Sequence, residues 1–497
     1  MTFSPLAQIV FVPVAMSAVV YLASRRWAER VGWLTCATVL YTLALAVFAA
    51  SQVTLVEQYG WASSINLTFG LRMDGLSAPF VVTILVLSAC ISVFSIPYMK
   101  HVIGKGHRQY GVYFALYLLY TAGMVGTCLA TNLIEFYLFY ELMLIPSYFM
   151  IAQWGYGERE RVSFMYFIWT HAGALLLLAG ILTTSAITGT FEISAIPGLL
   201  NRLSVPVQTQ AWIGAAMVIG FMVKLAGFGL HIWLPYAHAE APTPISALLS
   251  PAMIGIGSYA IVRLPLTFFP QIFQQYRGVL SLWALVTIIY GSMMALAQDD
   301  IKRLLAYSSI SQMGYIVLGI SSLEAMGLTG SMFHYISHGT CKGLLFMVAG
   351  TVILQTHGLR SIKKLGGLAS RMPLTAIAAL IGFLGIMGTP PLNGFQSEWL
   401  LFSGVFSRAI SSGSTLDLLV AIVGILVTVL TAVYGLWTVR RVFFGPCPEH
   451  LKSVVEPPPT VLIPLLVLVS LTVVLGVWPR LALDRLAPAI TSLLGAR

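Results

Sequence analysis

The chain has 497 residues, of which 58% are hydrophobic and only 9% are charged, and its mean hydropathy is +0.88. This composition leaves too little polar surface to cover a soluble globular protein, so we expect an all-α polytopic protein embedded in a lipid bilayer. Lysine and arginine exceed aspartate and glutamate by 27 to 17. The basic residues lie in short loops between apolar segments and not in runs with interleaved aromatic residues. This pattern indicates positive-inside membrane topology and argues against a nucleic-acid partner.

A helix needs about 20 apolar residues to cross the hydrocarbon core of a bilayer. Fourteen stretches of the sequence meet this requirement, and they are 5–23, 33–51, 77–99, 111–131, 132–154, 163–187, 211–235, 243–263, 279–297, 304–322, 324–355, 373–406, 416–439 and 459–479. The first span follows no basic segment and no cleavage site, so we expect it to be retained. Residues 52–76, with the alternating stretch SINLTFGLRM, predict a short external hairpin. The fourth and fifth spans are expected to meet in a tight turn near Asn132.

The loops differ in charge from one side of the predicted membrane to the other. If the N-terminus lies outside, the loops after odd-numbered spans carry 17 lysine and arginine residues, and the opposite side carries 8. The positive-inside rule then places both termini on the outer side of a prokaryotic inner membrane. The two remaining basic residues, Lys224 and Lys342, lie within predicted spans.

Two of the predicted spans, the seventh and the twelfth, are interrupted. The seventh is broken at Gly227, Gly229 and Pro235, and the twelfth at the sequence GTPPLNG of residues 388–394. The second break comes five spans after the first. Because five is odd, the second unit enters from the opposite side, as in inverted repeats with broken helices at a transport site. We therefore predict four parts: the first three helices and the hairpin in 1–110, a first repeat of five helices in 111–263, a second such repeat in 279–440 and a last helix in 459–497.

Ionisable side chains within the predicted spans are few, and each costs about 2.5–3.5 kcal/mol or more if it faces lipid. They must therefore face one another, freed backbone groups or water. The residues predicted to form a proton pathway are Glu141, Lys224, His231, His334, His338, Lys342 and Glu398. Glu141 and Lys224 are expected to pair, because a nearby carboxylate makes the proton affinity of a buried lysine adjustable. A purely structural salt bridge is the alternative.

His334, His338 and Lys342 recur every four residues and so share one face of a helix. Imidazole titrates near neutral pH, which suits proton transfer along such a row. One alternative is zinc binding by the two histidines, which the lysine one turn further on disfavours. The other is that neighbouring helices simply satisfy the histidines. His231 and His238 flank the first break and are expected to cap freed backbone groups there.

Other charged and sulfur-containing residues have structural interpretations. Asp74 is expected to cap the third span, Glu135 to lie at the turn near Asn132, and residues 299–303 (DDIKR) to form a solvated or interfacial ion-pair patch. The five cysteines are scattered without a metal-ligand spacing, so no metal or iron–sulfur site is predicted in this chain.

Four stretches, FYLFYELMLIPSYFMIAQWG, LHIWLPYAHAEAPTPISALL, AQDDIKRLLAYSSISQMGY and GTPPLNGFQSEWLLF, resemble the proton-translocating antiporter-like subunits of respiratory complex I. Among these, NADH-quinone oxidoreductase chain M (subunit 4) is the most similar. The family also includes Mrp-type cation/proton antiporter subunits and membrane subunits of group 4 hydrogenases and formate hydrogenlyases. The resemblance implies fourteen helices, inverted five-helix repeats, and a path from Glu141 and Lys224 through His338 and Lys342 to Glu398.

The sequence departs from chain M at two positions. Gly255 stands where the resemblance implies a central lysine on the eighth span, and Gln312 stands where the tenth span often has histidine. Conversely, Lys342 resembles chains L and N and the hydrogenase subunits. We therefore expect the central carrier on the eleventh span instead of the eighth.

The resemblance implies a proton-translocating subunit of a quinone-reducing NADH oxidoreductase complex, together with other antiporter-like membrane subunits and a peripheral redox arm. The alternatives are a group 4 hydrogenase or formate hydrogenlyase subunit, and an Mrp-type Na+/H+ antiporter subunit. No nucleotide loop, cluster ligands or haem motif occur in the sequence. Flavin, iron–sulfur or nickel centres are therefore expected in partner subunits, and the sequence leaves open whether H+ or Na+ is moved.

Overall fold

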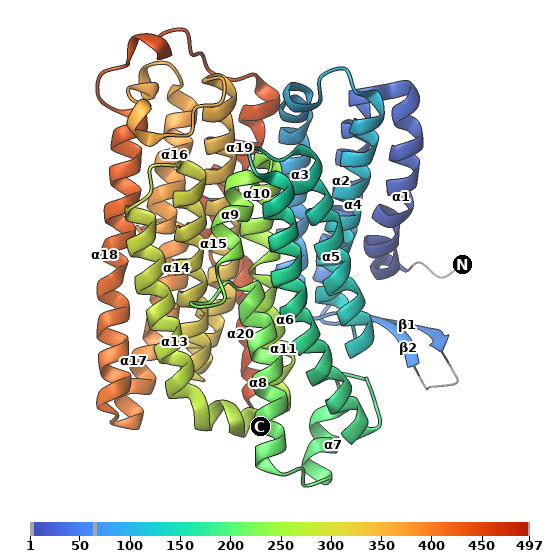
Figure 1. Cartoon of the computed structure of the whole chain (residues 1–497). Coiled ribbons are helices and arrows are strands. Elements are labelled where there is room, and N and C mark those ends of the chain that lie inside the picture. Colours follow the sequence, from blue (N-terminus) through green and yellow to red (C-terminus); the bar gives the residue numbers. More distant parts are fainter. Residues whose placement is uncertain (1–3, 63–66, 496–497) are drawn as a thin grey trace.

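The structure is a computed structural model that describes residues 4–62 and 67–495. It consists of long α-helices packed side by side, with a two-stranded sheet at the side of the bundle (Figure 1). The N-terminal half contains α1 (Pro5–Trp27), α2 (Val31–Ser51), β1 (Leu55–Ala62), β2 (Leu67–Met73), α3 (Ser77–Ile103), α4 (His107–Leu129), α5 (Leu133–Trp154), α6 (Arg159–Thr188), α7 (Ile196–Arg202), α8 (Val207–Lys224) and α9 (Trp233–Glu240). The C-terminal half contains α10 (Thr243–Leu248), a π-helical turn (Leu249–Met253), α11 (Ile256–Arg263), α12 (Pro265–Phe268), α13 (Pro270–Leu296), α14 (Ile301–Ser322), α15 (Ala325–Gln355), α16 (Pro373–Ile386), α17 (Asn393–Ser412), α18 (Thr415–Phe443), α19 (Pro459–Val477) and α20 (Arg480–Gly495).

Within these described ranges, eleven helical stretches are long and apolar enough to cross a membrane. The first of them, Pro5–Ser51, contains both α1 and α2. The prediction of a polytopic helical membrane protein is therefore confirmed. Two of the predicted spans, 211–235 and 373–406, are not continuous helices, because α8 ends at Lys224 and α16 ends at Ile386.

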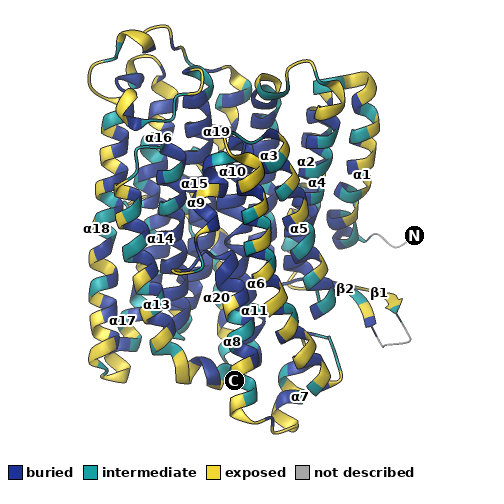
Figure 2. Cartoon of the chain, in the orientation of Figure 1, coloured by how far each residue is buried: buried dark blue, intermediate teal, exposed yellow. Residues whose placement is uncertain are grey.

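Helix α15 is the centre of the bundle. The most apolar part of α15 is completely buried, whereas only 28% of the corresponding part of α18 is buried. Neighbours on several sides cover α15, including α14, α16, α17, α19 and α3 (Figure 2). Polar side chains on α15 are therefore shielded from lipid and face other parts of the protein.

The predicted external hairpin is present. Strands β1 and β2 pair antiparallel, and the tip of the hairpin, residues 63–66, lies outside the described residues. The Glu57 carboxylate accepts hydrogen bonds from the backbone N–H groups of Leu6 and Ala7, both at 2.9 Å. These N–H groups have no partner within the first turn of a helix, so the hairpin caps the start of α1.

The predicted tight turn joins α4 and α5. The Asn132 side chain accepts a hydrogen bond from the Glu135 N–H at 2.8 Å and donates one to the Thr68 carbonyl oxygen at 2.7 Å. The Glu135 carboxylate accepts from the Gly70 N–H at 3.2 Å. Glu135 therefore lies at the turn, as predicted, where it connects α5 to the hairpin.

The loops fall into two groups at opposite ends of the bundle. The loops after α1, α3, α15 and α18, which belong to the basic group of the sequence, lie at the upper end of Figure 1. The sheet, α7 and the C-terminus lie towards the other end. The division of the loops between two faces therefore agrees with the sequence.

The last helix, α20, was not among the predicted spans. Its buried residues Ala482, Leu486 and Ile490 are four positions apart and so share one face. This face packs against α15 and α3, whereas Arg480 and Asp484 are exposed. The chain therefore ends in an amphipathic helix that lies against the bundle.

Asp74 lies directly before α3 and caps it, as predicted. Its Oδ1 accepts hydrogen bonds from the Leu76 and Ser77 N–H groups at 3.1 and 3.0 Å. The same carboxylate forms ion pairs with Arg263 at 2.6 Å and Arg72 at 3.2 Å. Burial alone would raise the pKa of Asp74, but the Arg263 guanidinium and the backbone donors hold this pKa well below its usual range. The carboxylate therefore joins α3 to the end of α11.

Replacing Asp74 with asparagine should destabilise the protein by about 3 kcal/mol, the lower end of the cost of breaking a buried ion pair, because Arg263, whose side chain is only 20% exposed, loses its partner. Since the pKa of Asp74 is lowered in the folded state, the stabilisation is complete at neutral pH and is lost as the pH falls towards the folded pKa. The melting temperature in detergent measures the effect. Asp484→Asn, at an exposed position, is the control and should not change it. Equal melting temperatures for the two variants would contradict this assignment.

Candidate functional site

The first helix break lies between α8 and α9, at residues 225–232. Ala226 and Gly229 have φ angles of 56° and 85° there, so the chain leaves right-handed helical geometry. Three indole N–H groups donate to carbonyl oxygens at the break, and they are Trp169 to Leu230 (2.8 Å), Trp233 to Val223 (2.9 Å) and Trp283 to Phe228 (2.9 Å). Irregular backbone at membrane depth persists only when its polar groups find such partners.

His231 lies within this break and caps it, as predicted. Its Nδ1 accepts a hydrogen bond from the Gly229 N–H at 3.2 Å. Its ring packs against Tyr290 and Phe228, with centroids 4.6 and 5.8 Å away. The capping role of His231 is thus confirmed, and its role in ion transfer stays a prediction.

Lys224 ends α8 and is 1% exposed. Its ammonium group lies 4.4 Å from the centroid of the Tyr140 ring. Among the described residues, no hydrogen-bond partner contacts this ammonium. A desolvated cation–π contact contributes about 2 kcal/mol, which is less than the cost of removing an ammonium from water. Lys224 is therefore an incompletely satisfied basic group beside the break.

The predicted direct pair between Glu141 and Lys224 is not formed. The Oε2 atom of Glu141 instead lies 3.1 Å from Nδ1 of His171 on α6. Successive helical residues point about 100° apart, so α5 presents Tyr140 to Lys224 and turns Glu141 towards α6. The carboxylate still interacts electrostatically with Lys224, although without contact. The Oε1 atom of Glu141 has no hydrogen-bond partner within the described chain.

The three predicted residues of α15 form a buried row. His334, His338 and Lys342 are 1%, 0% and 0% exposed. The Lys342 ammonium donates a hydrogen bond to the Leu305 carbonyl oxygen of α14 at 3.1 Å. The His338 ring interacts electrostatically with Lys342 and His334, but neither ring nitrogen has a hydrogen-bond partner among the residues described. The row therefore combines the amine of Lys342, which is hydrogen-bonded, with the imidazole of His338, whose two ring nitrogens have no hydrogen-bond partner among the described residues.

His238 of α9 extends this row towards the first break. The side chain is fully buried, and its ring lies 4.9 Å from that of Phe346 on α15. It interacts electrostatically with Lys342 and Lys302. Neither ring nitrogen is hydrogen-bonded within residues 4–62 and 67–495. The prediction that His238 caps freed backbone groups is therefore wrong, because its ring faces α15 and not the break.

Lys302 also differs from its prediction. It was expected in a solvated or interfacial patch, but it is fully buried. Its ammonium donates to the carbonyl oxygens of Ala239, at 3.4 Å, and Ala241. These oxygens belong to the C-terminal end of α9, where the helix dipole attracts a cation. The expected ion-pair patch is confirmed only at its edge, where Arg360 lies 2.5 Å from Asp300.

The second helix break, between α16 and α17, contacts the same row. Nε2 of His334 lies 2.7 Å from Oε1 of Gln312, and its Nδ1 lies 2.9 Å from the hydroxyl of Ser397 on α17. The Gln312 amide in turn donates to the Ile386 carbonyl oxygen at 3.5 Å, where α16 ends. Gln312 thus connects the row to the break.

Glu398 lies in the first turns of α17, close to the backbone of the break. A Cβ atom added at Gly388 would lie 2.2 Å from Oε2 of Glu398. Asn393, at the start of α17, donates from its amide to the Thr340 hydroxyl at 2.8 Å and accepts from the Ser337 hydroxyl at 3.0 Å through its carbonyl. The polar face of α15 therefore satisfies the backbone of the second break and brings Glu398 beside it.

Hydroxyl groups extend from the row towards the first repeat. The Leu305 carbonyl also accepts a hydrogen bond from the Ser309 hydroxyl at 3.0 Å, and this hydroxyl lies 2.7 Å from that of Ser250. Ser250 belongs to the π-helical turn, a distortion that is frequent at functional sites. In the same turn, the Met253 sulfur accepts from the Tyr166 hydroxyl at 3.5 Å. The turn therefore contacts both repeats.

The position of the missing lysine, Gly255, is filled by an aromatic ring. A Cβ atom at this position would lie 2.2 Å from Cδ2 of Tyr335. The Tyr335 ring stacks on Phe80 with centroids 4.2 Å apart, and its hydroxyl donates to the Ala252 carbonyl oxygen at 3.3 Å. A lysine at position 255 would collide with this ring, whereas α15 supplies Lys342.

Sequence reasoning left four neighbours of the pathway outside the predicted set, and they are His171, His238, Lys302 and Gln312. His171 and His238 are polar groups within or beside predicted spans, which is the signal that marks them. Lys302 carries no such signal, because a basic residue at a span end ordinarily faces water or headgroups. The sequence shows Gln312 as a polar residue within an apolar span, but it does not show that His334 is its hydrogen-bond partner.

The chain was compared with known proteins. A family model described as NADH:quinone oxidoreductase/Mrp antiporter, TM, matches residues 130–431, and one described as NADH-Ubiquinone oxidoreductase (complex I), chain 5 N-terminus, matches residues 61–114. The F(420)H(2) dehydrogenase subunit M of Methanosarcina mazei is 32% identical, over 98% of this chain and 97% of its own length. NADH-quinone oxidoreductase subunit M of Rhodobacter capsulatus is 31% identical, over 98% and 96%.

A solved structure shares the fold. A chain in the structure of respiratory complex I from Thermus thermophilus with bound NADH superposes with a TM-score of 0.87. It is 25% identical, and the match covers 99% of this chain and 100% of that chain. The breaks and the buried row described above therefore lie within an architecture shared along the whole chain.

Replacing Gly255 with alanine should destabilise the protein by about 1–3 kcal/mol, because the stacked Tyr335 ring must move. The matched control is Gly278→Ala on α13, where the nearest atom would be 3.8 Å from the new Cβ. This control should keep or slightly raise stability, since alanine favours helix over glycine. Thermal unfolding in detergent compares the two variants. In a Tyr335→Ala background the added loss should vanish, and a loss that persisted there would refute the steric explanation.

Proposed function

Because the chain belongs to the family of NADH:quinone oxidoreductase and Mrp antiporter membrane subunits, we propose that it translocates protons within a redox-driven membrane complex. Electron transfer takes place in partner subunits, which hold the flavin, iron–sulfur or nickel centres. The energy reaches this chain as a change of charge or conformation at its surface. Its own buried acids and bases carry the protons.

The observation that carries this proposal is the incomplete pairing of the buried groups between the two breaks. Among the described residues, Lys224, His238 and His338 lack hydrogen-bond partners for their side-chain nitrogens. Burying such groups is costly, and a structural role would favour complete pairs such as Asp74 with Arg263. A group that no fixed partner holds can instead exchange a proton with water or with the next group.

The proposed order of proton carriers is Lys224, His238, Lys342, His338, His334 and Glu398. The hydrogen-bonded hydroxyls of Ser309 and Ser250 lie beside this path, at the π-helical turn.

The Glu141–His171 pair stands at the beginning of the proposed proton pathway. The side chain of His171 is 36% exposed and that of Glu141 is 16% exposed, so a neighbouring subunit can contact the pair. A change of charge there alters the electrostatic potential at Lys224 and hence its proton affinity. Moving one charge against about 100 mV takes about 2.3 kcal/mol, which is comparable with a Coulomb interaction over a few ångströms in protein.

The proposal includes a membrane topology. If α1 and α2 each cross once, and if α8–α9, α10–α12 and α16–α17 each form one crossing, the chain crosses the membrane fourteen times. The crossings at the two breaks then run in opposite directions, as inverted repeats require. The basic loops face the cytoplasm of a prokaryotic cell and both termini face outwards.

The electron donor and the transported ion are to be identified with the whole complex, because they depend on its other subunits. Relatives of the chain are named for F(420)H(2) and for NADH, so the donor is set by the partner subunits. A group 4 hydrogenase-type complex would contain nickel subunits, and an Mrp-type Na+/H+ antiporter would contain no redox subunit. Purification of the native complex in mild detergent, with identification of its companions, distinguishes these alternatives.

Replacing Lys224 with alanine in the intact complex should reduce proton pumping at least about tenfold, because the first carrier is lost. Electron transfer to an artificial acceptor in the peripheral arm should remain unchanged. Acidification of inverted membrane vesicles, followed with a pH-sensitive dye, measures pumping. Lys105→Ala, which changes an exposed loop lysine, is the control and should pump normally. Full pumping by the Lys224 variant would refute the pathway.

A further inference from the structure

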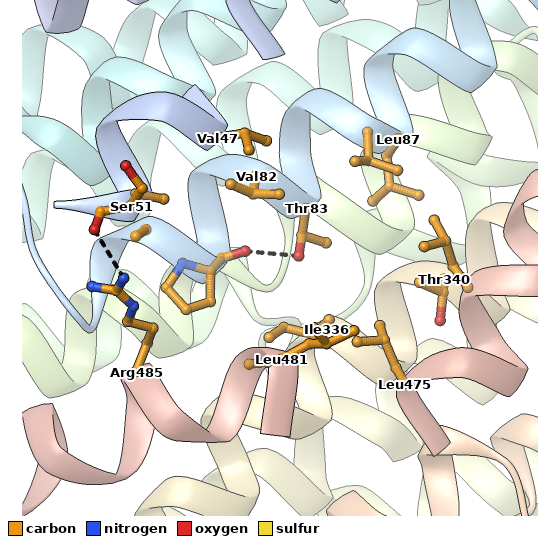
Figure 3. A pocket seen from close by; sticks show the side chains of 16 residues that line it. Val47, Ser51, Val82, Thr83, Leu87, Ile336, Thr340, Leu475, Leu481 and Arg485 are labelled. Carbon is orange, nitrogen blue, oxygen red and sulfur yellow. Dashed lines mark hydrogen bonds between the residues drawn. The ribbon is translucent and has the colours of Figure 1, made fainter. Parts of the chain in front are cut away.

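An apolar cavity of about 430 Å³ lies between α2, α3, α15, α19 and α20 (Figure 3). Its walls include Val47, Val82, Leu87, Ile336, Leu475 and Leu481. Protein interiors contain few voids larger than a water molecule, so a space of this size calls for an occupant. An apolar wall excludes water and favours hydrocarbon. The proposed proton pathway makes no use of this cavity.

Arg485 of α20 lies at one end of the cavity, beside Ser51 (Figure 3). Its guanidinium donates hydrogen bonds to the carbonyl oxygens of Gln52 at 2.9 Å and Ser51 at 3.3 Å. The ion pairs within residues 4–62 and 67–495 do not include Arg485. A guanidinium has more N–H donors than these two bonds use. The remaining donors are therefore open to an anion.

Arg485 also lines a second cavity of about 810 Å³, which we call the polar cavity because its walls are more polar than those of the first. The other charged residues of this cavity are Arg72, Asp74, Glu192, Arg263 and Asp484. Both other arginines are paired with Asp74. Glu192 accepts a hydrogen bond from the Thr68 hydroxyl on the hairpin at 2.8 Å, and Asp484 lies on the exposed face of α20. Arg485 is therefore the unpaired cation at which an apolar cavity and a polar cavity meet.

We propose that these two cavities bind one anionic phospholipid. The phosphate lies on Arg485, one acyl chain fills the apolar cavity, and the rest of the headgroup occupies the polar cavity. Guanidinium and phosphate form charge-assisted hydrogen bonds, and the amphipathic α20 holds the guanidinium at the boundary between apolar and polar surroundings. An apolar cavity, a cation and a more polar cavity follow one another in the same order as the acyl chain, the phosphate and the headgroup of a single lipid molecule.

The bound acyl chain would contact the central helix of the proton pathway. Ile336 and Thr340 of α15 line the apolar cavity. The Thr340 hydroxyl accepts a hydrogen bond from Asn393 at the start of α17. The lipid thus fills the space behind the second helix break and keeps water out of α15 from this side. This inference goes beyond the proposed function, because lipid binding and pumping are measured separately.

Photolabelling tests the proposal. The intact complex is reconstituted into phosphatidylcholine vesicles that contain phosphatidylglycerol with a diazirine in one acyl chain. Illumination should label the cavity-lining parts of α3 and α19 in the natural protein. Arg485→Gln should reduce this labelling about tenfold, because the phosphate loses its partner. Val82→Phe, which fills the apolar cavity, should reduce it to a similar degree.

Two controls make the result specific. Arg480→Gln changes an exposed arginine on the same helix, so labelling should stay at the level of the natural protein. A diazirine-labelled diacylglycerol, which has the same acyl chains but no phosphate, should label the cavity about tenfold less. Equal labelling in Arg485→Gln and the natural protein, equal labelling by the two probes, or labelling that reaches only partner subunits would each overturn the proposal.

Discussion

The structure depends on one constraint, which is that polar groups at membrane depth must find partners inside the protein. The two helix breaks meet this constraint in different ways. At the first break, indole N–H groups such as that of Trp233 donate hydrogen bonds to the carbonyl oxygens that the break leaves unpaired. At the second, hydroxyl and amide groups around α15 do so, as in the contact of Asn393 with Thr340. Among the described residues, the side-chain nitrogens of Lys224, His238 and His338 are left without hydrogen-bond partners. The molecule thus places unsatisfied bases beside the first helix break and on the central helix that contacts the second.

Much of the fold could be predicted because lipid restricts what a chain can do. Apolar stretches must be helical to satisfy their backbone, so the spans and the two breaks follow from hydropathy together with residues such as Gly227 and Gly229. Pro235, by contrast, lies in the first turn of α9 and not in the break. The hairpin followed from its alternation. Helix α20 was missed because its apolar face is narrow. Arg480, Asp484 and Arg485 interrupt its first half and Pro488 lies in its second half, so no continuous apolar stretch marks it.

The site was predictable where spacing along one helix decides it, and not where two helices must be rotated against each other. The four-residue spacing of His338 and Lys342 placed both on one face of α15, a helix that is buried on all sides. The pairing of Glu141 depended on the rotation of α5, which brings Tyr140 to Lys224 and Glu141 to His171. Long-range contacts of this kind leave no trace in a single sequence. The same holds for the Tyr335 ring that fills the place beside Gly255.

The buried ammonium of Lys302 has a mechanical consequence. It holds the carbonyl oxygens at the end of α9, and the Tyr156 N–H donates to the neighbouring Glu240 carbonyl oxygen at 2.7 Å. The second half of the broken helix is therefore fastened to α14 and to the loop after α5. The first half, α8, is joined to it by residues 225–232 and by the hydrogen bond from the Trp233 indole to the Val223 carbonyl oxygen. Any movement of α8 relative to α9 would therefore have to change the backbone of residues 225–232, next to Lys224.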